Sequence, residues 1–347
     1  MRDRFRRGRK AVSLAALATT LSVTACSTGS APREPTIDAT VTGSPDASAT
    51  DPQPVPAVAG MVAQEIAVGD GPGDFPTVAF GSLWVPNIAD GTISRIDLQT
   101  GQVVSTVPIG RSDEPPDRSN VSPFSVAAGG GSVWATRDLD DRYAVVRVDP
   151  GTSRVVESFR VDATPYALAW GAGAVWMTSR DDGAVVRIDP STGEARVADV
   201  ERATGIVVDG SAVWVGTGWG ELHRLDPATG RAMARTMVGA DLEVLAAGGG
   251  SLWAADGGAA AVVRIEPATG RAMAEVELPG PTWTLAATHA DVWAGASSTL
   301  YRIDQASGEV VGEVALPGSV NGIAVGAGSI WAASVERDTV YRITPVS

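Results

Sequence analysis

The sequence predicts an all-β fold, a seven-bladed β-propeller made of four-stranded antiparallel blades. Three observations predict it: a tryptophan motif that returns seven times, a basic-apolar-acidic triplet after each tryptophan, and a last copy that ends after its third strand. A period of about forty residues with four short strands and one tryptophan is typical of propeller blades. We therefore assign residues 61–347 to one propeller domain.

The tryptophan motif places the indole after small and apolar residues, as in "GSVWATR" at 131–137 and "GAVWMTS" at 173–179. Its copies are Trp84, Trp134, Trp176, Trp214, Trp253, Trp293 and Trp331. On the second strand of each blade, a large flat side chain fills the wedge against the next blade. We interpret the seven tryptophans as structural.

The triplet after each tryptophan is predicted to lie on the third strand. Its copies are "RID" at 95–97, "RVD" at 147–149, "RID" at 187–189, "RLD" at 224–226, "RIE" at 264–266, "RID" at 302–304 and "RIT" at 342–344; only the last departs from the pattern, with Thr344 in the acidic place. The arginines are expected to stack on the tryptophans or to pair with the nearby acid. Turns such as "DPSTGE" then predict a tight hairpin with a bulge, because Pro presets φ and Gly supplies a positive φ.

One copy divides into four short strands by its period of two. In the third copy these are predicted at 165–170, 174–178, 184–189 and 193–200. The seventh copy lacks its fourth strand, whereas "MVAQEIAVG" at 61–69 matches the outer strand "GEVVGEVALPG" at 308–318. We expect this N-terminal strand to pair with the last blade and close the ring, which removes an exposed sheet edge.

The N-terminal segment has the composition of an export signal. Residues 1–25 join a basic stretch to a short apolar one, and "VTAC" resembles the bacterial lipobox, which assigns lipidation to Cys26. The alternative is a chance cysteine near an ordinary cleavage site. Residues 26–60 then form a lipidated, disordered stalk rich in Pro, Ser, Thr and Ala, and we expect an exported protein anchored to the outer face of the cytoplasmic membrane.

Charge narrows the choice of partners. The formal net charge is −13 although the first 25 residues are basic, so the remainder is strongly acidic. Nucleic acid is disfavoured as a partner because phosphate binding needs a basic surface. We expect a monomer that meets a small molecule, a peptide or a cell-surface protein and contacts the membrane only through its lipid.

Positions that differ between the copies are expected to carry specificity. Ten residues before each tryptophan, at one rim of the channel, stand Asp74, Phe124, Tyr166, Thr204, Glu243, Trp283 and Asn321. Loops between second and third strands add Asn87, Arg137, Arg180, Trp219 and Asp256 on the same face. Aromatic walls with converging polar groups predict a ligand site there. The alternative is a set of solvated rim residues.

Two insertions interrupt the period, at 111–122 and 137–143, and both are expected over this face. They form either a lid or an acidic surface. A cation held by Asp138, Asp140 and Asp141 is disfavoured, because their spacing matches no calcium loop.

The run "LWVPNIADGTISRIDLQTGQVVSTVPIG" at 83–110 resembles the YVTN-type propeller repeats of bacterial surface and periplasmic proteins, over residues 61–347. It is also similar to the repeats of streptogramin (virginiamycin B) lyase, and this resemblance implies His and Glu with magnesium in the funnel. Only His223 and His289 exist, and neither belongs to a pair, although Glu243 and Asp74 remain possible metal ligands.

We predict no catalytic residue, no cofactor and no metal site. The predicted function is binding at the funnel face without catalysis, and the alternative is a metal-dependent lyase of the streptogramin type. The repeat resemblance is specific for the fold alone, because propellers host many activities.

Overall fold

A computed structural model describes residues 57–109, 123–139, 142–210 and 212–346. The predicted signal segment, Cys26, most of the predicted stalk and the insertion at 111–122 lie outside the described residues. No helix in the described ranges is long and apolar enough to cross a membrane.

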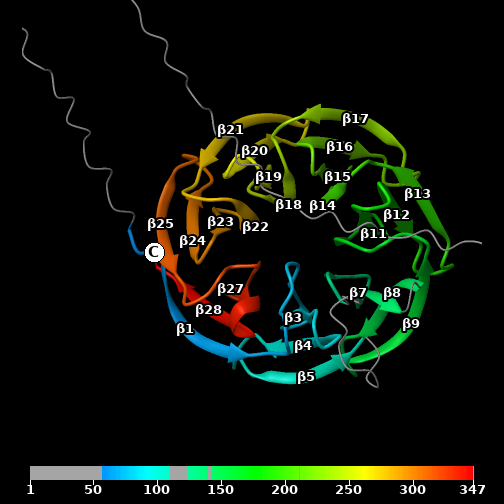
Figure 1. The fold of residues 1–347 in the computed structure, drawn as a ribbon, viewed down its shortest axis with the longest axis horizontal. Coiled ribbons are helices and arrows are strands. Elements are labelled where there is room, and N and C mark those ends of the chain that lie inside the picture. The colour runs from blue at the N-terminus through cyan, green and yellow to red at the C-terminus, as the bar shows by residue number, and fades with distance from the viewer. Residues whose placement is uncertain (1–56, 110–122, 140–141, 211, 347) are drawn as a thin grey trace, which may run out of the picture. The chain divides into compact units, whose positions relative to one another are not determined.

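The described chain folds into seven four-stranded antiparallel sheets arranged as a ring (Figure 1). In six of the sheets the chain moves outward from the centre strand by strand, and in the seventh β1 forms the outermost strand beside β28. The outermost strands are β5, β9, β13, β17, β21, β25 and β1. This arrangement confirms the predicted seven-bladed β-propeller.

Blades one to four take the first half of the ring. Their strands are β2 (Thr77–Ala79), β3 (Ser82–Asn87), β4 (Thr92–Asp97), β5 (Val103–Pro108), β6 (Val126–Gly129), β7 (Ser132–Leu139), β8 (Arg142–Asp149), β9 (Arg154–Val161), β10 (Leu168–Gly171), β11 (Ala174–Ser179), β12 (Ala184–Ile188), β13 (Ala195–Asp199), β14 (Ala203–Asp209), β15 (Ala212–Thr217), β16 (Glu221–Leu225) and β17 (Ala232–Met237). In the third blade the four strands fall where the sequence predicts them, with ends that differ by up to three residues.

Blades five to seven complete the ring. Their strands are β18 (Leu242–Gly248), β19 (Ser251–Asp256), β20 (Ala261–Glu266), β21 (Arg271–Glu277), β22 (Thr282–Ala287), β23 (Asp291–Ala296), β24 (Thr299–Asp304), β25 (Val310–Ala315), β26 (Gly322–Gly326), β27 (Ser329–Ser334), β28 (Thr339–Pro345) and β1 (Gly60–Ala67). A single 3₁₀ turn, η1 (Val335–Arg337), joins β27 to β28 in this part of the described chain.

The ring is closed by the first strand pairing with the last, as predicted. Strand β1 is antiparallel to β28, with Glu65 opposite Tyr341. The residues before β1 continue onto blade six, where the N–H of Ala59 donates to the carbonyl oxygen of Glu313 at 3.0 Å. Residues 57–60 therefore also belong to the ring, and the N-terminal segment joins blades six and seven.

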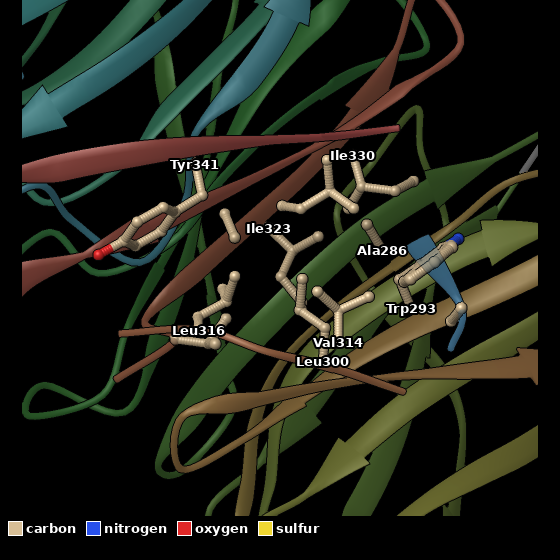
Figure 2. Packing of buried hydrophobic residues seen from close by; sticks show 12 residues of the cluster. Ala286, Trp293, Leu300, Val314, Leu316, Ile323, Ile330 and Tyr341 are labelled. Atoms are coloured by element: carbon tan, nitrogen blue, oxygen red, sulfur yellow. The ribbon is translucent and has the colours of Figure 1, made fainter. Parts of the chain in front are cut away.

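Seven apolar clusters hold the blades together, and each lies between neighbouring sheets. Figure 2 shows the cluster between blades six and seven, in which Trp293 of blade six packs near Ile323 and Ile330 of blade seven. All seven motif tryptophans are buried in this way. Burial of such large aromatic surfaces stabilises each interface, which agrees with the structural interpretation of the repeat.

The triplet arginines lie over the tryptophans in all seven blades. Each arginine stands directly opposite its tryptophan on the neighbouring strand, for example Arg95 opposite Trp84. The guanidinium carbon is between 5.0 Å and 6.0 Å from the ring centroid in every pair. Stacking is therefore confirmed in all seven blades. Pairing with a nearby acid is found for Arg302, 2.8 Å from Asp291, and for Arg147, 3.6 Å from Glu157.

Several of these arginines also tie one blade to the next. Nη1 of Arg95 in blade one donates to the carbonyl oxygen of Pro150 in blade two at 2.6 Å. Nη1 of Arg342 in blade seven donates to the carbonyl oxygen of Gln99 in blade one at 3.1 Å. The second bond spans the closure point, so the repeat stabilises the ring as well as each wedge.

The acidic residue of the triplet accepts hydrogen bonds within the following hairpin turn, which differs from the predicted pairing with arginine. Oδ1 of Asp97 accepts hydrogen bonds from the N–H and the hydroxyl of Thr100 at 2.8 Å and 2.9 Å. These bonds hold the pKa of Asp97 below its usual range. Gly101 then adopts a φ of +66°, and the pairing shifts between Arg95 and Ile96. The predicted hairpin with a bulge is confirmed, with the acid as its anchor.

Candidate functional site

A cavity of about 340 Å³ opens at the centre of the ring, on the face that carries the links between blades. Six residues chosen from the sequence line it: Asp74, Tyr166, Arg180, Glu243, Trp283 and Asn321. Four further residues complete its lining: Phe75, Asp241, Val244 and Val320. Of the five loop residues selected from the sequence, Arg180 shares the cavity with residues of the links.

Bulges in the innermost strands explain why this position faces the channel. Leu242 and Val244 of β18 pair with consecutive residues of β19, so Glu243 is an extra residue in the strand. The same shift makes Trp283 the extra residue of β22. A bulge bends the strand and redirects its extra side chain. The backbone of these two blades therefore turns Glu243 and Trp283 toward the ring centre.

Glu243 is held by two partners from another blade. Its Oε2 accepts a hydrogen bond from the Tyr166 hydroxyl at 2.6 Å, and its Oε1 lies 2.9 Å from Nη1 of Arg180. Glu243 belongs to blade five and both partners to blade three, so the contact crosses the inner face of blade four. Burial and the adjacent Glu243 raise the pKa of Tyr166, so its phenol stays protonated as a donor. We call these contacts of Glu243 with Tyr166 and Arg180 the Glu243 clasp; they fix one wall of the cavity.

Three aromatic rings from blades one, two and three meet beside this clasp. The centroid of Phe75 lies 5.8 Å from those of Phe124 and Tyr166, and the latter two are 5.0 Å apart. Phe75 also packs against the clusters between blades three and four and between blades five and six. It therefore lies near the middle of the ring. Phe124 is not part of the cavity lining, but its ring contacts Phe75 and Tyr166, which are.

Two carboxylates of the cavity lack a cationic partner. Within the described residues, neither Asp74 nor Asp241 forms an ion pair; Asp241 shares a hydrogen bond with the neighbouring Glu243, and its buried Oδ1 has no partner. Burial, and after it the charge of Glu243, raises the pKa of Asp74 to about 6. The same two causes raise the pKa of Asp241 to about 6. Desolvation disfavours the charged form of a carboxyl group.

Asn87 and Asp256 do not line the cavity, although the sequence placed them among its residues. Nδ2 of Asn87 donates to the hydroxyls of Thr92 and Ser94, both at 2.9 Å, inside blade one. The Asp256 carboxylate accepts four backbone N–H bonds, from Ala240, Asp241, Gly258 and Ala259, at 2.7 to 3.1 Å. Both side chains are buried and shape loops. Asp256 in particular holds the segment that presents Asp241.

The other sequence-selected positions also lie outside the lining. Thr204 is buried, and its hydroxyl donates to the carbonyl oxygen of Leu242. Trp219 is 51% exposed, with the Arg202 guanidinium over its ring at 5.8 Å. Nε of Arg137 is buried without a hydrogen-bond partner in the described structure. None of these three side chains lines the cavity.

Sequence reasoning missed Phe75, Asp241, Val244 and Val320. Each lies within two residues of a position that the tryptophan spacing selected. A fixed distance from the tryptophan finds one side chain in each blade, whereas the turn before the innermost strand presents several. Asp241 was detectable as an acidic residue two positions before Glu243, on the same face of an extended segment.

Neither histidine belongs to the cavity lining. His223 lies on β16, with Nε2 3.1 Å from Oε2 of Glu221. His289 lies in the turn between β22 and β23, on the opposite face. Among the described residues, no group of three or more His, Cys, Asp or Glu side chains is arranged to hold a metal ion. The cavity is thus walled by carboxylates, one guanidinium and aromatic rings.

No protein-family model matches the chain. No curated protein sequence matches it at a significant level either. The propeller fold is established by the structure, while the closer kinship with YVTN-type repeats or with the streptogramin lyases stays a prediction.

Proposed function

We propose that this chain is a binding protein that holds a small molecule or a short peptide in the central cavity. The observation that carries this proposal is a preformed cavity with fixed walls and two carboxylates, Asp74 and Asp241, that form no ion pair within the described residues. Ligand sites are concave, and a few polar groups in them converge among apolar side chains. The clasp of Glu243 with Tyr166 and Arg180 keeps the walls in place before a ligand arrives.

We propose further that the bound ligand is held and not converted. Proton transfer needs a positioned side chain whose pKa suits the working pH, and histidine serves this role most often. His223 and His289 are both outside the lining. Glu243 is already engaged by Tyr166 and Arg180, which suits a wall better than a general base. Asp74 and Asp241 have pKa values of about 6, which would suit proton transfer, but no serine, cysteine, lysine or histidine of the described residues lines the cavity to act with them. No observation favours the lyase alternative over binding.

The chain is also proposed to act outside the cell on a lipid tether. The support is the basic and apolar segment at 1–25 and the single cysteine, Cys26, directly after it. We expect the expressed protein to sediment with membranes and Cys26→Ala to be released from them. A Cys26→Ala variant that still sediments with membranes would contradict the lipid anchor. Cell fractionation with detection of the lipidated peptide by mass spectrometry makes this test.

Binding is tested with a thermal-shift screen of the purified chain against cell-wall fragments, short peptides, macrocyclic lactones and divalent metal ions. A ligand that binds only the folded state raises the melting temperature. Trp283→Ala and Trp219→Ala form a matched pair, because the two indoles are 47% and 51% exposed but only Trp283 lines the cavity.

We expect a ligand whose stabilising effect is lost in Trp283→Ala and kept in Trp219→Ala. An effect lost in both variants, or in neither, would move the site away from the cavity. Turnover of a macrocyclic lactone in the presence of magnesium would replace binding by the lyase function.

A further inference from the structure

The charges lining the cavity do not balance. The lining holds three carboxylates, those of Asp74, Asp241 and Glu243, and one guanidinium, that of Arg180. Arg180 and Glu243 form an ion pair at 2.9 Å and compensate each other. When ionised, Asp74 and Asp241 therefore leave two negative charges in the cavity.

Other charged groups near these two carboxylates do not compensate them. Arg180 and Arg202 act on Asp241 from a distance and lower its pKa only partly against burial and Glu243. No arginine, lysine or histidine nitrogen of the described residues lies within 4.0 Å of either carboxylate. A buried carboxylate is normally paired or hydrogen-bonded, because desolvation is otherwise costly. The cavity therefore lacks a positive partner for Asp74.

The rest of the lining is apolar or aromatic. Phe75, Val244 and Val320 contribute apolar surface, and Trp283 adds a half-exposed indole packed against Gly257. An aromatic face attracts a cation and also accepts an alkyl or aryl group. A divalent ion suits this lining poorly, because among the described residues no three carboxylates are arranged to hold a metal ion, and Glu243 is already engaged by Tyr166 and Arg180. A cavity of about 340 Å³ has the size of a small-molecule site.

We propose that the cavity selects a small organic cation, with an ammonium or guanidinium group against Asp74 and Asp241 and an apolar group against Trp283 and Phe75. This inference rests on the proposed binding function and adds the chemical class of the ligand. Charge-assisted hydrogen bonds to a desolvated carboxylate are stronger than neutral ones, so they give the cavity its selectivity.

The binding of such a cation depends on pH with a definite sign. The groups that face the two carboxylates are Glu243, Tyr166, Arg180 and Arg202, and the pKa values of Tyr166 and Arg180 are both raised. The carboxyls with pKa values of about 6 are Asp74 and Asp241. A cation needs them ionised, so its affinity falls as the pH drops through 6. When the pH is lowered from about 7.5 to about 5, we expect the affinity for the cation to fall roughly tenfold for each of the two carboxylates.

The experiment compares phenethylamine and benzylguanidine with 2-phenylethanol and 3-phenylpropionate on the purified full chain. The four probes share a phenyl group and differ in charge. Binding is measured by calorimetry and by the fluorescence of the tryptophans at both pH values. The variants are Asp74→Asn and Asp241→Asn, and Asp181→Asn is the control because this exposed residue lies on the same face outside the lining.

We expect both cations to bind about tenfold or more tightly than the alcohol at the higher pH. Each of Asp74→Asn and Asp241→Asn should weaken the cations about tenfold and reduce the pH dependence, while Asp181→Asn leaves both unchanged. Circular dichroism confirms that every variant is folded.

Three outcomes overturn the inference. If 2-phenylethanol or 3-phenylpropionate binds as tightly as the cations, and Trp283→Ala abolishes it, the binding function stands and the cation class is wrong. If no probe binds, the cation class is also wrong, and the broader screen decides the function separately. If magnesium or calcium displaces the cations through Asp74, the site is a metal site.

Discussion

The seven stacked tryptophan–arginine pairs, which we call the tryptophan–arginine layer, differ from the central cavity in how completely their side chains are partnered. In the layer, each tryptophan is buried under an arginine, and many of these arginines donate to serine hydroxyls or to the next blade. In the cavity, Glu243 is held by Tyr166 and Arg180, but Asp74 and Asp241 form no ion pair in the described structure. Most of the repeated side chains partner one another, whereas two of the variable side chains in the cavity stand without a cationic partner.

This difference has an energetic meaning. Repeated contacts stabilise every interface of a repeat protein in the same way, so they can be shared among copies. A ligand site instead carries groups that destabilise the empty state, and this cost is repaid when the ligand binds. The predictions below test whether substitutions in the two regions affect stability with opposite signs.

The largest expected effect is in the layer. Trp253→Ala removes a buried indole and leaves Oε1 of Gln305 in blade six without its donor, now at 3.1 Å from Nε1. We expect a loss of about 3–5 kcal/mol in the free energy of unfolding, measured by urea denaturation. Trp283→Ala is the control, and its loss should stay below about 1 kcal/mol because that indole is half-exposed. Equal losses would contradict the distinction between the regions.

The next effect concerns a residue beside the cavity that belongs to the scaffold. Asp256→Ala deprives four backbone N–H groups of their acceptor. We expect a loss of about 2–4 kcal/mol in the free energy of unfolding, because hydrogen bonds to a charged acceptor are among the stronger ones. Asp181→Ala, at an exposed position, should leave the urea midpoint unchanged. A small effect of Asp256→Ala would contradict this structural role and leave the predicted role of Asp256 in ligand binding open.

Substitution in the cavity is expected to stabilise the empty protein. The pKa of Asp74 is raised to about 6, so the folded state holds this proton more tightly than the unfolded state. Stability is therefore lost as the pH rises from about 4 through 6, and it stays lost above that. Asp74→Asn should be more stable than the natural chain by about 1–3 kcal/mol at about pH 7.5 and no more stable at about pH 4. Urea denaturation at both pH values measures this difference. A destabilising effect at the higher pH would show that Asp74 is partnered.

The smallest effect is expected from restoring a serine that blade four lacks. In four blades the arginine Nε donates to a serine two residues before the tryptophan, as Arg95 does to Ser82 at 2.9 Å. Blade four has Ala212 there, and Nε of Arg224 is buried without a partner among the described residues. Ala212→Ser should stabilise the protein by about 0.5–1.5 kcal/mol, read from the urea midpoint.

Blade three supplies the control for this prediction. Ala174 occupies the same position, but Nε of Arg187 already donates to the carbonyl oxygen of Pro227 at 3.1 Å. Ala174→Ser should therefore bring a smaller gain than Ala212→Ser. An equal gain in both blades would mean that the missing acceptor of Arg224 has no energetic weight.

The fold was predictable because its determinants are periodic. The spacing of Trp84 to Trp331 and the paired triplet define the blades, and the shared pattern of 61–69 and 308–318 locates the closing strand. The ring centre was predictable only in part. Asn87 and Asp256 are polar residues of the kind that often contact ligands, yet their side chains form hydrogen bonds with backbone and hydroxyl groups of their own loops. Whether a polar side chain meets its own loop or a ligand depends on local geometry that spacing does not encode.

Because β1 pairs with β28, the ring can close only after the last strand has been synthesised. The N–H of Gly71 donates to Oδ1 of Asp338 at 2.9 Å, across 267 positions of the chain. During synthesis, the early strand leaves the ribosome long before its partner exists, whereas the other six described blades are made from contiguous segments. Non-local pairing of this kind is slow, since a long loop must close first. An unfinished ring would expose strand edges to other chains, so the joining of its two ends is the step at which aggregation competes with folding.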